Sequence, residues 1–309
     1  MRTNTLCLKW LVAVSALSAM FSSAARADTI VYAETSAQQF GTVDLNTGTF
    51  NYIGDNFNPA NPDLSGPLGF GVANGNLYTV HWGSGSTQAL YEIDPATGTE
   101  TYVADTGSNE IQGIGSTANG LYAVTGLLGG PFILNSLNPL TGTLTPIGAT
   151  GFTNTSVGLD VSAVSDTGAL FATSGTDLYS IDTSTGTATL IGSLGSTFAS
   201  SLDTPDDSML SLLYENGVLY GSYESSLFAP HPAYTIYTIN TTTGLATALS
   251  TGTEGPSYFS SPYPVPLAYF APDPIPSAAI PEPSSPALIV LMAVPFILAF
   301  AVRRRSLTV

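Results

Sequence analysis

Lysine and arginine are almost absent from this chain of 309 residues, which contains six of them in total. They are Arg2, Lys9, Arg26, Arg303, Arg304 and Arg305. The stretch from Asp28 to Val302 therefore has no lysine or arginine, yet it carries all 22 carboxylates of the chain. Nucleic acid is excluded as a partner, because phosphates are neutralised by these two residue types. The same absence argues against nucleotide chemistry, which needs cations around the phosphates.

Cysteine is just as scarce, since Cys7 is the only one. It lies in a segment with a basic start, an apolar stretch from Trp10 to Phe21 and a small-residue signature at Ala25–Ala27. This order is typical of a signal peptide, so we expect signal peptidase to remove residues 1–27 and to leave Asp28 first. The exported chain would then have no thiol, which excludes cysteine nucleophiles, thiolate metal sites and disulfides.

What the chain does contain is a repeat of about fifteen residues, such as "LYEIDPATGTETYVA" at 90–104. Five copies share a glycine: Gly48, Gly98, Gly142, Gly186 and Gly244. These glycines are 50, 44, 44 and 58 residues apart, and periods near this size are typical of propellers and related arrays. Each copy reads as two short strands joined by an Asp/Asn-x-x-Thr-Gly turn, in which the Asp or Asn side chain bonds to the backbone and glycine supplies a positive φ.

A second hairpin precedes most copies, with tight turns at Asn74-Gly75, Asn119-Gly120, Thr167-Gly168 and Asn216-Gly217. Asn-Gly between strands is a strong hairpin signal. A full unit therefore has four strands, A to D, and we predict an all-β propeller over residues 28–272 with five antiparallel four-stranded blades. The first unit lacks a strand A, which we expect residues 264–272 to supply. The alternatives are a six-bladed ring that uses 193–235 for extra strands and an open β-solenoid.

Blade topology places the loops between strands B and C and between strands D and A on one face, called here the loop face. These loops are longer than the other turns, and binding residues concentrate in such loops. The ligand-binding candidates on this face are His81, Trp82, Phe132, Phe228 and His231. For the two histidines, ordinary hydrogen bonding within a loop is the competing interpretation. The recurrent Leu-Tyr tyrosines, by contrast, indicate packing between strands.

The loop at 201–208 holds a cluster of carboxylates from Asp203, Asp206 and Asp207. Such a cluster could bind a hard cation such as Ca²⁺, which takes several oxygen ligands. The EF-hand spacing is missing, however, and a solvated loop is the preferred interpretation. No nucleophile elbow, zinc-protease or phosphate-loop motif is present. We therefore assign no catalytic residue from the sequence.

The C-terminal end has three parts. A proline-rich linker at 273–286 contains Pro281-Glu282-Pro283, an apolar run extends from Ala287 to Val302, and Arg303-Arg304-Arg305 follows. We expect residues 287–309 to form a transmembrane helix with a basic cytoplasmic tail. This layout resembles the PEP-CTERM sorting signal of Gram-negative bacteria. The resemblance implies transient attachment to the inner membrane, recognition by an exosortase, removal of the tail and delivery to the cell surface or extracellular matrix. A permanent anchor is the alternative.

The blade repeat is similar to those of exported bacterial propellers of the quinoprotein-like and lactonase-like kinds. Together, these features predict an exported propeller without enzymatic activity that binds polysaccharide or another surface component. A secreted hydrolase or lyase that uses carboxylates or histidine on the loop face is the alternative, and a purely structural propeller is the third reading.

Overall fold

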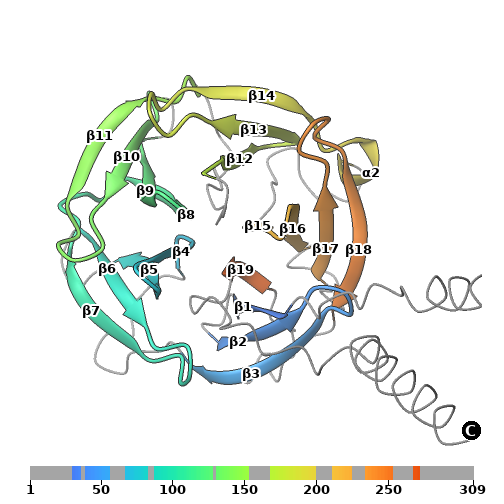
Figure 1. Cartoon of the computed structure of the whole chain (residues 1–309), viewed down its shortest axis with the longest axis horizontal. Helices are drawn as coiled ribbons and strands as arrows, with labels where there is room; N and C mark the ends of the chain where they lie inside the picture. The colour runs from blue at the N-terminus through green and yellow to red at the C-terminus, as the bar shows by residue number, and fades with distance from the viewer. Residues whose placement is uncertain are drawn as a thin grey trace, which may run out of the picture. The chain divides into compact units, whose positions relative to one another are not determined.

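The computed structural model describes residues 30–35, 39–55, 67–82, 87–127, 130–152, 168–199, 211–224, 234–252 and 267–271. These residues form five antiparallel sheets arranged around one axis, so the protein is a five-bladed β-propeller, as the sequence predicts (Figure 1). They belong to one compact unit, Asp28–Ile275. In the four blades whose strand A is described, that strand lies nearest the axis, and in all five blades strand D forms the rim (Figure 1).

Blades 1 and 2 each have four described strands, A to D from the axis outward (Figure 1). Blade 1 contains β19 (Leu267–Ala271), β1 (Ile30–Thr35), β2 (Gln39–Asp44) and β3 (Thr49–Asp55). Blade 2 contains β4 (Phe70–Ala73), β5 (Asn76–Trp82), β6 (Gln88–Ile93) and β7 (Glu100–Asp105).

The remaining blades follow in chain order. Blade 3 contains β8 (Ile111–Thr117), β9 (Gly120–Thr125), β10 (Ile133–Leu137) and β11 (Leu144–Ala149). Blade 4 contains β12 (Leu170–Ser174), β13 (Asp177–Ile181) and β14 (Ala188–Ser193), and its expected strand A lies outside the described residues. Blade 5 contains β15 (Ser211–Glu215), β16 (Val218–Glu224), β17 (Tyr234–Ile239) and β18 (Ala246–Gly252).

The ring closes by pairing the two ends of the propeller sequence. Strand β19 runs antiparallel to β1, with Ala33 opposite Phe270 and Tyr32 opposite Ala271. The Phe270 side chain is fully buried, and its backbone N–H donates to Ser211 Oγ of blade 5 at 2.8 Å. The predicted closure is therefore confirmed. It gives β1 a partner on each side, which removes an exposed sheet edge.

The turns follow the local chemistry read from the sequence. Asn74 and Gly75 have φ values of 54° and 80°, and a two-residue hairpin with both φ values positive matches the right-handed strand twist. In the turn between strands C and D of blade 2, Asp94 Oδ1 accepts from the backbone N–H of Ala96 at 2.9 Å. The Thr97 hydroxyl donates to Asp94 Oδ2 at 3.0 Å. The remaining copies of the repeat use Asp44, Asn138, Asp182 and Asn240 at the same place.

Each strand D contains a β-bulge, which inserts one extra residue opposite strand C. In blade 2, Leu90 pairs with Ala104 and Tyr91 pairs with Tyr102, so Val103 has no partner. The extra residues in blade order are Ile53, Val103, Ile147, Ile191 and Leu249. All five pack against buried hydrophobic clusters. A bulge twists a rim strand away from further pairing, and a domain without lysine needs such protection.

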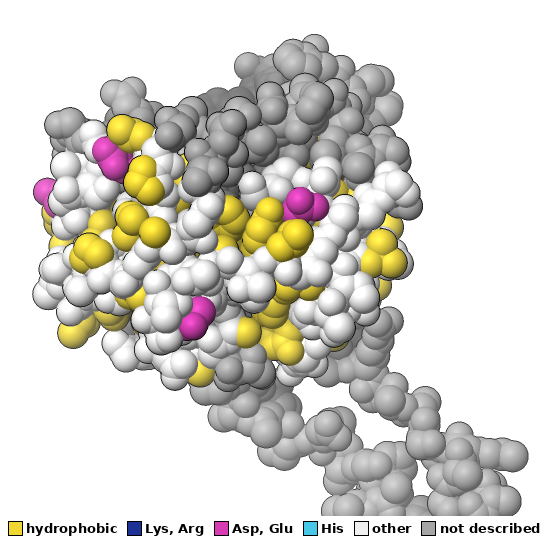
Figure 2. All heavy atoms as spheres, turned by 90° about the horizontal axis from the view of Figure 1, so that it is seen from above, with side chains coloured by type: hydrophobic (Ala, Val, Ile, Leu, Met, Phe, Trp, Pro, Cys, Tyr) yellow, Lys and Arg dark blue, Asp and Glu magenta, His cyan; other side chains and the backbone are white. Residues whose placement is uncertain are grey.

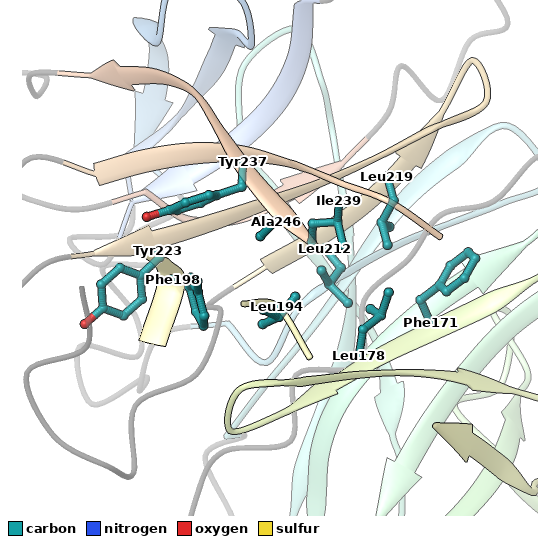
Figure 3. Packing of buried hydrophobic residues seen from close by; sticks show 10 residues of the cluster. All are labelled: Phe171, Leu178, Leu194, Phe198, Leu212, Leu219, Tyr223, Tyr237, Ile239 and Ala246. Carbon is teal, nitrogen blue, oxygen red and sulfur yellow. The ribbon is translucent and has the colours of Figure 1, made fainter. Parts of the chain in front are cut away.

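The hydrophobic core is divided into five clusters, one at each junction between neighbouring blades. Figure 3 shows the cluster between blades 4 and 5, where Leu178 and Phe171 of blade 4 lie opposite Leu212 and Leu219 of blade 5. Phe198 of the short helix α2 (Ser196–Ala199) joins it. Burying each such side chain contributes about 1.5–3 kcal/mol, so adjacent blades stabilise one another around the ring.

The described part of the chain has no helix with the length and apolar character needed to cross a membrane. The expected signal peptide at 1–27, the linker at 273–286 and the expected transmembrane helix and tail at 287–309 lie outside the described residues.

Candidate functional site

The strongest cluster of titratable side chains among the described residues lies in blade 2, not in a loop. His81 was expected in the loop between strands B and C, but it belongs to β5. Its Nε2 lies 2.6 Å from Glu100 Oε1 of β7, and both side chains are only 1% exposed. The two side chains form a hydrogen bond, in which the tautomer of the histidine decides which atom donates.

Aromatic rings connect this buried pair to the rim of the propeller. The His81 and Tyr91 rings meet edge to face, with centroids 5.6 Å apart. Tyr91 meets Tyr102 in the same way at 5.8 Å, and Tyr102 is 55% exposed. Burial raises the pKa of the Tyr91 phenol, and the nearby Glu100 carboxylate raises it further. The phenol therefore stays protonated at physiological pH and can donate a hydrogen bond.

The pair faces the junction with blade 1. Leu77 lies four residues before His81 on β5, so the two side chains share one face of the strand. Leu77 packs with Phe40 of blade 1 and with Ile93 in the cluster between the two blades. This cluster has four fully buried hydrophobic residues, the fewest of the five described clusters. A buried His–Glu pair therefore sits where the apolar contact between blades is smallest.

Glu100 was missed by the sequence reasoning, although the repeat carried a signal. It occupies the position after Thr-Gly-Thr, where the corresponding residues are Phe50, Leu144, Ala188 and Ala246. It is thus the one charged side chain at a position that otherwise faces the core. Its second oxygen, Oε2, is buried and accepts no hydrogen bond from the residues that the structure describes.

The aromatic ligand candidates fare differently. Phe132 was expected to face a ligand, but its side chain is only 1% exposed. It packs with Val124 and Leu170 between blades 3 and 4, so it is not available to a ligand. Trp82 is the last residue of β5 rather than a loop residue. Phe228 and His231 lie outside the described residues.

The proposed cation site falls on residues that the structure does not describe, since Asp203, Asp206 and Asp207 lie in the gap between 199 and 211. Within the described ranges, no group of three or more His, Cys, Asp or Glu side chains could hold a metal ion. The sorting residues Pro281, Glu282, Pro283, Arg303, Arg304 and Arg305 also lie outside them.

Burial limits the chemistry of the His81–Glu100 pair, because a substrate cannot reach it from solvent. A histidine hydrogen-bonded to a carboxylate can act as a general base, but only within reach of a substrate proton. Here both side chains are 1% exposed. The exposed end of the cluster is Tyr102, whose hydroxyl and ring lie on the rim beside Asp105. The Asp105 carboxylate also raises the pKa of Tyr102, after the larger effect of partial desolvation.

No protein-family model matches the chain, and no curated protein matches it. Solved structures are similar to it at low identity. TolB from Acinetobacter baumannii is 13% identical with a TM-score of 0.43, over 80% of this chain and 60% of that one. A chain of a nidogen–laminin complex is 10% identical with a TM-score of 0.47, over 79% of this chain and 98% of that one. The Bacteroides ovatus protein GH43B of a xyloglucan PUL is 14% identical with a TM-score of 0.46, over 75% of this chain and 59% of that one.

The chain thus spans about three fifths of the TolB and GH43B chains. At these identities, the assignment of a propeller rests on the strand pairing of this chain itself.

Proposed function

We propose that this protein is an exported β-propeller, delivered to the cell surface or the extracellular matrix, where it binds a polysaccharide or another surface component without turning it over. The observation that carries the proposal is the distribution of charge. All six basic residues lie at the two ends, inside segments with the order of a signal peptide and of a PEP-CTERM sorting signal. From Asp28 to Val302, between these basic residues, the chain has 22 carboxylates and no lysine or arginine.

The acidic surface of the propeller supports a role outside the cell. The face in Figure 2 carries scattered carboxylates among neutral and hydrophobic side chains, with no lysine or arginine visible on its described part. Such a surface stays soluble through its net charge and repels anionic polymers. Binding rather than catalysis is supported by the burial of the His81–Glu100 pair. Signal peptidase and an exosortase are the partners that this route requires. The carboxylates of the 201–208 loop are the proposed ligands of a bound Ca²⁺.

The test places binding and turnover side by side. Purified protein comprising residues 28–275 is run through native gels that contain soluble polysaccharides, and the same polymers are assayed for released reducing ends. We expect retarded migration without release. Release of reducing ends that disappears in the His231→Ala or Asp206→Asn variant would replace the proposal with the hydrolase or lyase alternative.

A further inference from the structure

The outer strands of two neighbouring blades end in the same pattern. Blade 1 has Tyr52-Ile53-Gly54-Asp55 and blade 2 has Tyr102-Val103-Ala104-Asp105. At the corresponding places, blades 3, 4 and 5 have Pro-Ile-Gly-Ala, Leu-Ile-Gly-Ser and Ala-Leu-Ser-Thr, from residues 146, 190 and 248. The Tyr-x-x-Asp pattern is therefore not required by the blade, since the rest of the ring builds strand D without it.

The bulge brings the two side chains of each pattern together. In a regular strand, residues three apart point to opposite faces. In blade 2, however, Tyr102 pairs with Tyr91 and Asp105 pairs with Ala89 of β6. Residues 89 and 91 share a face, so Tyr102 and Asp105 share it as well. Blade 1 repeats this register, with Tyr52 opposite Gly41 and Asp55 opposite Gln39.

Both tyrosines are large exposed side chains on the rim, at 55% for Tyr102 and 42% for Tyr52. Tyr102 is also held from behind. Its ring meets Tyr91 at an interplanar angle of 78°, and Tyr91 meets His81 at the same angle. The His81–Glu100 hydrogen bond ends this row inside the blade. A ring supported in this way loses little freedom when a ligand stacks on it.

We propose that each Tyr-x-x-Asp pair is a binding site for a neutral polysaccharide, with the tyrosine ring against the apolar face of a sugar and the aspartate accepting its hydroxyl hydrogens. This rests on the proposed function and names the site for it. Tyrosine offers an apolar ring and a polar hydroxyl at once, and a carboxylate is a strong acceptor. Anionic polymers are disfavoured because the domain has no lysine or arginine to meet them.

Two sites on adjacent blades also explain why the pattern occurs as a pair. A repeating polymer that engages both sites binds the second one intramolecularly, which raises the overall affinity without any new contact. Loss of one tyrosine should therefore remove both a stacking contact and this bivalent gain.

The experiment uses the 28–275 protein in native gels that contain a neutral polymer (hydroxyethylcellulose, galactomannan or dextran) or a cationic one (chitosan or polylysine). The variants are Tyr52→Ala, Tyr102→Ala, Asp105→Asn and the double tyrosine variant. Leu190→Ala is the matched control, because Leu190 holds the equivalent position in blade 4 and is 56% exposed. We expect the dissociation constant for at least one polymer to rise about tenfold with Tyr102→Ala and further in the double variant. Leu190→Ala should leave it unchanged, and thermal unfolding should show that all variants are folded.

Several results would overturn the inference. If the wild-type protein binds a neutral polymer and the tyrosine variants bind equally well, the sites are elsewhere, while the proposed binding function stands. If it binds only chitosan or polylysine, and loses them in high salt, the pairs recognise cations instead. If it binds no polymer at all, polysaccharide is removed as a ligand in both proposals, and export can still be measured separately.

Discussion

A buried histidine–glutamate hydrogen bond at one junction of a repetitive ring is the most specific feature at the scale of single residues. His81 and Glu100 are each 1% exposed, while the other four blades carry no charged residue at the position of Glu100. Removing one of these side chains leaves the polar group of the other buried without its hydrogen-bond partner. Replacing both with apolar groups removes this penalty.

We therefore predict that Glu100→Leu lowers the free energy of unfolding by about 1–3 kcal/mol. The variant that combines Glu100→Leu with His81→Leu should recover most of this loss. Urea unfolding followed by tyrosine fluorescence measures both. Equal losses in the single and double variants would mean that the pair contributes nothing beyond the packing of its side chains.

Asp182 provides a prediction for pH. The hydroxyl of Ser184 donates to Asp182 Oδ1 at 2.7 Å and the Ser184 backbone N–H at 2.8 Å, and these bonds lower the pKa of Asp182 below its usual 3.8. A lowered pKa in the folded state stabilises the protein above the unfolded-state pKa, and this stabilisation disappears as the pH falls through the folded-state pKa.

The Asp182→Asn variant keeps an acceptor but does not titrate, and asparagine already stands at the equivalent turns as Asn138 and Asn240. The difference in Tm between wild type and variant should be constant above about pH 5. Below about pH 4, the Tm of the wild type should fall relative to that of the variant. A difference that stays constant down to pH 2.5 would contradict this assignment.

At the scale of strands and turns, the blades fit together through close backbone approaches between each strand D and the next Thr-Gly turn. A Cβ atom added to Gly54, Gly148 or Gly192 would lie 2.0–2.2 Å from the carbonyl oxygen of Thr97, Thr185 or Thr243 in the next blade. A real Cβ atom cannot approach so closely, so the second glycine of the repeat is a contact between blades.

Gly192→Ala should therefore lower the free energy of unfolding by about 1–3 kcal/mol through overpacking alone. Blade 2 carries Ala104 at the equivalent position, so Ala104→Gly is the control and should cost about 1 kcal/mol or less. Chemical denaturation of the two variants under the same conditions compares them. If Gly192→Ala is as mild as the control, the close approach relaxes at little cost.

The sequence predicts these elements well because their signals are local. The Asn-Gly turns and the Asp/Asn-x-x-Thr-Gly turns each depend on a few neighbouring residues. The side-chain contacts are harder to predict, because they depend on the bulge. One extra residue in strand D reverses the alternation of faces, which puts Tyr102 beside Asp105. His81 was assigned to a loop because β5 continues two residues past the apolar alternation.

At the scale of the whole molecule, stability is distributed around a closed ring. Each junction holds one hydrophobic cluster. The junction between blades 5 and 1 depends on β19, whose Phe270 packs with Val31 and Leu213. A ring opened at this strand loses a cluster and exposes the edge of β1.

A chain that ends at residue 266 should therefore unfold at lower temperature and self-associate, whereas one that ends at Ile275 should behave as the full propeller. The loss should be at least the roughly 3–5 kcal/mol that removal of one buried phenylalanine side chain costs. Calorimetry and light scattering on the two truncations test this. Equal unfolding temperatures for both would show that β19 does not close the ring.

The charge distribution also belongs to the whole molecule. Its basic residues would serve only in export and sorting, and the protein that remains would work as an acidic propeller. Measuring the intact mass of the protein recovered from outside the producing cells tests this account most directly. We predict a chain that begins at Asp28 and lacks Arg303–Val309. A mass that includes this basic tail, or protein found only in the membrane fraction, would contradict it.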